Sequence, residues 1–76
     1  MFGIFRSRGE RELEAIVESM KINLQNNYKE PAHNDRRRIR ERADALYAEG
    51  GISETVYKRY IRIYDEYTIK LKDYKH

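Results

Sequence analysis

The 76-residue sequence has no cysteine, no tryptophan, a single proline and no long apolar run. Without cysteine, neither a disulfide framework nor a thiolate zinc site can stabilise the fold. No apolar stretch approaches the roughly 18 residues that a membrane-spanning helix needs. The first residues also lack the order of a secretory signal, in which basic residues precede a longer apolar segment. We therefore expect a cytoplasmic protein of the small bacterial type.

Residues suited to catalysis or metal binding are scarce as well. The two histidines, His33 and His76, have no partner at the i, i+4 spacing that helical metal sites use. Gly50 and Gly51 are not surrounded by a phosphate-loop motif. The sequence therefore predicts a non-enzyme without metal, cofactor or small-molecule substrate.

Little apolar material remains for a core, because 38% of the residues are charged and 39% are hydrophobic. A chain this short buries a smaller share of its surface than a larger protein does. Self-association is then the common way to bury more, so we expect a homodimer or higher oligomer, or a complex with another protein. The net charge of +3 permits a polyanionic partner without arguing for one.

Hydrophobic periodicity predicts three helices, and the links between them are short. Ser7 and Glu10 match a capping box ahead of the first helix. Short links favour an all-α, three-helix fold in which the second and third helices form an antiparallel hairpin, completed by homo-oligomerisation. The expected ranges within this single domain are about 8–28, 32–49 and 54–74.

Turn and capping residues set the other expected helix ends. Pro31 suits the first turn of the second helix, which begins either there or a few residues later, with Asn34 or Asp35 as its cap. Gly50 ends that helix because glycine readily takes the left-handed conformation. Ser53 is the expected cap of the third helix.

The third helix carries a stripe of mostly tyrosine side chains at alternating steps of three and four residues. This spacing keeps the stripe on one helical face. Buried phenols need hydrogen-bond partners, and aromatic residues are enriched in protein interfaces. We expect Tyr57, Tyr60 and Ile61 to pack within the hairpin. The predicted contacts with another chain are Tyr64, Tyr67, Leu71 and Tyr74.

A second apolar group, containing Phe2, Ile4 and Phe5, lies at the start of the chain. Exposed apolar clusters are rare on monomers, so we expect these residues to cover the bundle or fill a groove on a neighbouring subunit. Phe2 and Phe5 are therefore further interface candidates. A weaker alternative is peripheral membrane association through residues 1–8, which would be weak and reversible.

Arginines are concentrated near the start of the second helix, and they point all round it. Arg37 with Glu41, and Arg40 with Asp44, can pair at i, i+4 spacing, so we interpret the cluster as a salt-bridged surface. Contacts with phosphates or acidic partner residues are the alternative. The arginines concerned are Arg36, Arg37, Arg38, Arg40 and Arg42.

The segment 46–60 resembles the turn of helix-turn-helix DNA-binding regulators. Gly51, Ile52 and Ser53 match the glycine, aliphatic residue and serine cap that open the recognition helix of that family. The resemblance implies DNA binding, with Lys58 and Arg59 on the exposed face and Arg36 to Arg42 on phosphates. The segment also resembles the short helical hairpins at the ends of many bacterial proteins. We favour an interaction or assembly module and keep DNA binding as the alternative.

Overall fold

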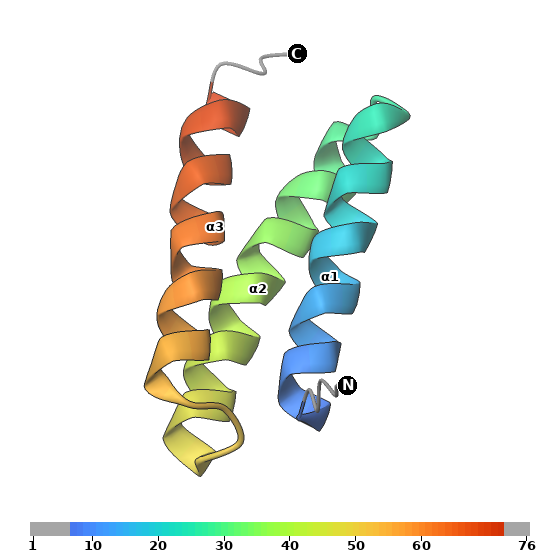
Figure 1. Ribbon diagram of the computed structural model, residues 1–76. Coiled ribbons are helices and arrows are strands. Elements are labelled where there is room, and N and C mark those ends of the chain that lie inside the picture. The colour runs from blue at the N-terminus through green and yellow to red at the C-terminus, as the bar shows by residue number, and fades with distance from the viewer. Residues whose placement is uncertain (1–6, 73–76) are drawn as a thin grey trace, which may run out of the picture.

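The computed structural model describes residues 7–72, which form three α-helices and contain no strand. Figure 1 shows α2 lying between α1 and α3. The predicted all-α, three-helix fold is confirmed. No helix within this described part is long and apolar enough to cross a membrane. The helices are α1 (Arg8–Gln25), α2 (Lys29–Glu49) and α3 (Glu54–Lys72).

Three of the expected helix ends have the predicted capping residues; of the predicted capping box, the Ser7 half is present and the Glu10 carboxylate accepts from Arg59. The Ser7 hydroxyl accepts a hydrogen bond from the Glu10 amide at 3.1 Å, which caps α1. Gly50 ends α2 in the left-handed conformation, with φ of 80°. The Ser53 hydroxyl accepts from the Val56 amide at 3.2 Å at the start of α3. These ends follow from local chemistry alone.

The link between α1 and α2 differs from the expectation. α1 ends at Gln25 rather than near residue 28, because the chain turns at Asn27, whose φ is 62°. α2 begins at Lys29, with Tyr28 as its N-cap and Pro31 in its first turn. Proline is tolerated there because the first-turn amides have no intrahelical acceptor. The expectation of a cap at Asn34 or Asp35 is therefore wrong, since both lie inside α2.

The core lies between α2 and its two neighbours. Leu13 and Met20 of α1 and Ile39 of α2 are fully buried within it, and Tyr60 is the α3 member of this core cluster. Gly9 allows α1 to approach the α2–α3 turn, since a Cβ there would lie only 3.0 Å from Ile52 Cγ2. The remaining buried members are Ile16, Val17, Ala32, Ala43, Leu46 and Ile52.

Direct polar contacts between α1 and α3 occur only near the starts of these helices, within the described residues. The Arg59 guanidinium donates to Glu10 at 2.9 Å, and the Tyr60 hydroxyl donates to Glu14 at 2.6 Å. Figure 1 shows α1 and α3 diverging toward their other ends. We call the end with the α2–α3 turn the closed end. The open end contains the last turns of α1 and α3 and the first turns of α2.

Candidate protein-interaction groove

A groove separates α1 from α3 at the open end. Leu24 and Tyr67 are half-buried and pack against the core, so they give the groove an apolar floor. We call this feature the α1–α3 groove. It is lined by Lys21, Leu24 and Gln25 of α1 and by Tyr67 and Lys70 of α3.

The walls of the groove are positively charged. The Lys70 ammonium lies 5.0 Å from the centre of the Tyr67 ring, within cation–π distance. Neither Lys21 nor Lys70 forms an ion pair with a residue in the described range 7–72. A ligand with apolar side chains and carboxylates would match this combination of floor and walls.

The rest of the tyrosine stripe is divided among several environments. Tyr60 is only 2% exposed, and Leu71 only 4%. Burial, followed by the hydrogen bond to Glu14, raises the pKa of the Tyr60 phenol, so this hydroxyl stays protonated in the folded chain. Tyr67 lines the groove. Tyr74, Phe2 and Phe5 lie outside the described residues.

Tyr64 belongs to the contact between α2 and α3. The guanidinium carbons of Arg36 and Arg40 lie 5.0 and 5.6 Å from the centre of its ring. Arg36 also donates to the Thr68 hydroxyl at 2.8 Å, and Thr68 in turn donates to the Tyr64 carbonyl at 2.8 Å. Two cations therefore cover a ring that the sequence places among the interface candidates.

Tyr57 likewise connects α3 to α2. Its hydroxyl donates to the Asp44 carboxylate at 2.6 Å, and its ring stacks on Tyr47 with 4.6 Å between centroids. This hydrogen bond raises the pKa of the Tyr57 phenol. The same bond, together with one from Arg40, lowers the pKa of Asp44.

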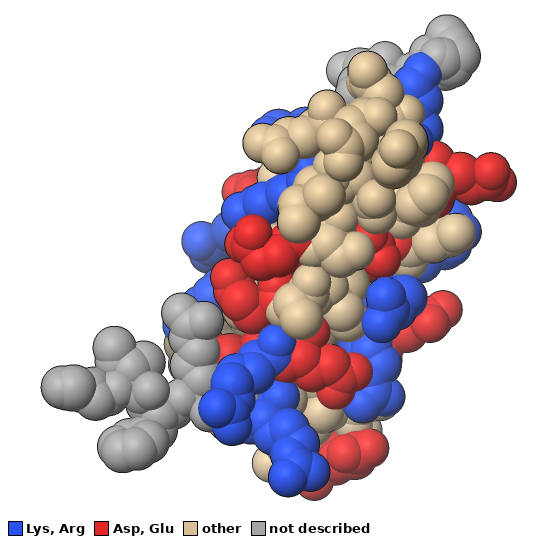
Figure 2. All heavy atoms as spheres, turned by 90° about the vertical axis from the view of Figure 1, so that its right-hand side faces the viewer, with Lys and Arg blue, Asp and Glu red and all other residues tan. Residues whose placement is uncertain are grey.

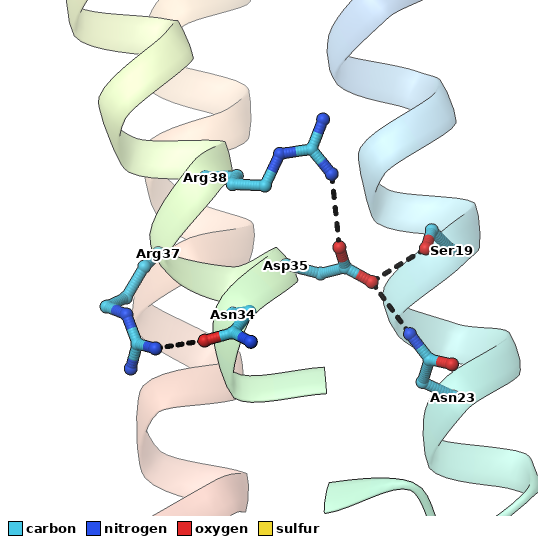
Figure 3. Close-up of polar contacts among 6 residues, drawn as sticks. All are labelled: Ser19, Asn23, Asn34, Asp35, Arg37 and Arg38. Carbon is cyan, nitrogen blue, oxygen red and sulfur yellow. Dashed lines mark hydrogen bonds and ion pairs between the residues drawn. The ribbon is translucent and has the colours of Figure 1, made fainter. Parts of the chain in front are cut away.

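Asp35 forms a buried polar contact between α1 and α2 that sequence reasoning missed. Its carboxylate accepts hydrogen bonds from Ser19 at 2.7 Å, Asn23 at 2.9 Å and Arg38 at 3.3 Å (Figure 3). The i, i+4 spacing of Ser19 and Asn23 on α1 is a signal that they share one face. The carboxylate is satisfied within the chain, so it serves the helix–helix contact rather than a ligand.

The arginines of α2 are engaged within the chain. Arg40 forms the predicted ion pair with Asp44 at 3.1 Å. Arg37 instead donates to Asn34. Arg42 donates to both carboxylate oxygens of Glu12 on α1, and this bond lowers the pKa of Glu12.

Lys58 and Arg59, the candidate nucleic-acid contacts on α3, also have carboxylate partners. Lys58 pairs with Glu54 at 3.2 Å and Arg59 with Glu10 at 2.9 Å. Each basic residue that the sequence proposes for DNA contacts therefore has a polar partner inside the described chain. Within residues 7–72 the arginine cluster thus forms contacts inside α2 and from α2 to both α1 and α3.

Besides the groove, the surface has one other candidate contact area. Figure 2, which faces the right-hand side of Figure 1, shows an uncharged area over the upper part of that side. Exposed uncharged residues of α1 and the turn after it include Ile22, which is 52% exposed, and Tyr28, which is 57% exposed. Asn26 and Asn27, also exposed, lie between them in the chain. The amide side chains of Asn26 and Asn27 separate the apolar residues of this segment in the chain, whereas Leu24 and Tyr67 together form the apolar floor of one groove. The α1–α3 groove is therefore the stronger candidate.

No cluster of three or more potential metal ligands occurs among residues 7–72. His33 is half-buried in α2, and His76 lies outside the described residues. No protein-family model, curated protein or solved structure matches this chain.

Proposed function

We propose that this chain is a non-enzymatic helical interaction module that assembles with a further copy of itself through the α1–α3 groove. An antiparallel α2–α3 hairpin forms its base, and homo-oligomerisation covers its open end. The observation that carries the proposal is the divergence of α1 from α3, which leaves Leu24 and Tyr67 only half-covered in a lysine-walled groove.

Contacts along the α2–α3 seam support the hairpin. Tyr57 near the start of α3 reaches Asp44 late in α2, whereas Thr68 late in α3 reaches Arg36 early in α2. This order is that of two helices running in opposite directions. The hairpin holds the groove-facing edge of α3 in a fixed orientation.

The energetic reason for assembly is the thin core. Burial of apolar surface contributes about 25 cal/mol per Å², so a half-covered Leu and Tyr represent stabilisation that the lone chain leaves unused. A tyrosine suits an interface that is wet before assembly, because its hydroxyl can bond water when the ring is exposed. The DNA-binding alternative has no such observation in its favour, because its candidate cations are paired within the chain.

Light scattering over a concentration series, with Tyr67→Ser and Ile69→Ser as matched variants, tests this function. Ile69 is the control because it lies two residues away and is 68% exposed, away from the groove lining. We expect the wild type to exceed the monomer mass of 9.2 kDa, Tyr67→Ser to fall to that mass, and Ile69→Ser to behave as the wild type.

Circular dichroism melting shows whether each variant is still folded. Loss of assembly in a folded Tyr67→Ser variant supports the groove as the contact. A wild type that remains monomeric at every concentration, or equal effects of the two substitutions, would contradict the proposed function.

A further inference from the structure

One edge of α3 combines apolar side chains with charges of both signs. Ile63, Glu66, Tyr67 and Lys70 follow the i, i+3, i+4, i+7 spacing that places residues side by side on a helix. Ile63 and Tyr67 are half-buried against the core, while Glu66 and Lys70 are exposed. We call these four residues the α3 edge. Two of the four, Tyr67 and Lys70, also line the α1–α3 groove, so the α3 edge borders the groove.

Neither charged residue of the α3 edge is neutralised within the described chain. Glu66 and Lys70 form no ion pair there, although their i, i+4 spacing would allow one, and Lys70 lies over the Tyr67 ring instead. Arg62, Asp65 and Lys72 of α3 also form no ion pair within residues 7–72, but Glu66 and Lys70 are the ones that share an edge with the half-buried Ile63 and Tyr67. The α3 edge therefore retains both an anion and a cation for an external contact.

We infer that the groove is filled by α3 of a second copy, which runs antiparallel to the first α3 across a two-fold axis. This inference rests on the proposed self-assembly and names its geometry. Residues 66 and 70 lie symmetrically about residue 68, so a two-fold axis near this point places Glu66 of one copy opposite Lys70 of the second copy. The same operation creates the reciprocal pair, as an isologous interface requires.

The opposite wall of the groove suits the same occupant. Lys21 of α1 faces the groove without a carboxylate partner in residues 7–72. An α3 helix seated between the two walls places its Glu66 between Lys21 on one wall and Lys70 on the other, and brings its own Ile63 and Tyr67 onto the apolar floor. The chain thus supplies a helix edge with apolar side chains and one carboxylate, Glu66, that its basic, apolar groove would bind.

Charge reversal on the α3 edge tests this geometry. In a two-fold dimer, Glu66→Lys or Lys70→Glu alone creates two like-charge contacts, so each should raise the dimer dissociation constant about tenfold or more. The double variant Glu66→Lys/Lys70→Glu restores the two opposite-charge pairs but places the new lysine at position 66 beside Lys21, so it should recover much, though not all, of the affinity that either single variant loses. Sedimentation equilibrium measures all of these constants directly.

Matched controls make the same charge changes off the edge. Asp65→Lys adjoins Glu66 and Lys72→Glu follows Lys70 by two residues, and both positions are exposed. These controls should leave the dissociation constant within about twofold of the wild type, since exposed charges away from a contact contribute little. Circular dichroism shows that each variant keeps its helical content.

The outcomes separate this inference from the proposed function. A dimer that Tyr67→Ser disrupts but the charge reversals do not affect would overturn the α3 pairing and leave self-assembly in place. Single variants that weaken the dimer without rescue in the double variant would also overturn the reciprocal pairing. A wild type that stays monomeric would overturn both, and rescue by the double variant supports both.

Discussion

The closed and open ends of the molecule use different kinds of contact. At the closed end, Gly9 allows α1 to pack closely against the α2–α3 turn. Glu10 and Glu14 of α1 accept hydrogen bonds there from Arg59 and Tyr60 of α3. At the open end α2 remains bound to α1 through Asp35 and to α3 through Arg36, but no direct polar contact joins α1 to α3 there within residues 7–72. One end therefore completes a three-helix bundle, whereas the other leaves room for a fourth element.

The largest expected effect is on the free energy of unfolding, and it should differ between Tyr60 and Tyr67, two residues of the same stripe. Tyr60→Ala removes a ring that is 2% exposed and should lower the free energy of unfolding by about 3–5 kcal/mol. Tyr67→Ala removes a half-covered ring and should cost about 1 kcal/mol in the monomer. Urea unfolding at a low, fixed protein concentration measures both, and equal losses would contradict the difference between the two ends.

An intermediate effect is expected at the polar contact that joins α1 to α2. Asp35 is 6% exposed, so Asp35→Ala leaves Ser19 and Asn23 without their acceptor and should cost about 1–3 kcal/mol. Asp65→Ala, at an exposed position of α3, is the matched control and should change stability by less than about 0.5 kcal/mol. A thermal melt that moves equally for both would show that the buried carboxylate contributes nothing.

The smallest expected effect is on the pH dependence of the free energy of unfolding. Because hydrogen bonds lower the pKa of Glu12 and Asp44, folding favours their charged forms. This stabilisation is complete above their ordinary pKa values of about 4 and is lost as the pH falls through the lowered values. Both carboxylates are partly exposed, so the loss should be modest.

The variant Arg42→Gln isolates the Glu12 part of this acid response. Without the guanidinium, the pKa of Glu12 should return toward its ordinary value, and stability should depend less on pH between about 5 and 3. Melting temperatures across this range measure the slope. A slope as steep as that of the wild type would show that the Glu12–Arg42 pair does not contribute.

Local signals in the sequence predicted the parts of the fold that depend on local chemistry. The three helices, the caps at Ser7 and Ser53, and the end of α2 at Gly50 follow from spacing and capping residues. The start of α2 was not predicted from the sequence. It depends on the left-handed conformation of Asn27, and because asparagine also adopts this conformation in other exposed turns, the residue type alone does not mark a helix boundary.

Contacts between helices were less predictable, because they depend on which faces meet. The roles of Gly9 and Asp35, and the pairing of Tyr60 with Glu14, become visible only when α1 is placed against its neighbours. The groove depends on the divergence of α1 from α3, which no local pattern encodes. The tyrosine stripe did indicate that α3 meets other elements, but not that Tyr64 lies beneath two arginines of α2.

The solution mass of the unmodified chain tests most directly whether the open end is covered by a second copy. Sedimentation equilibrium across a wide concentration range should give a mass that rises from 9.2 kDa toward twice that value. A mass that stays at 9.2 kDa throughout, with the chain fully folded, would contradict the account.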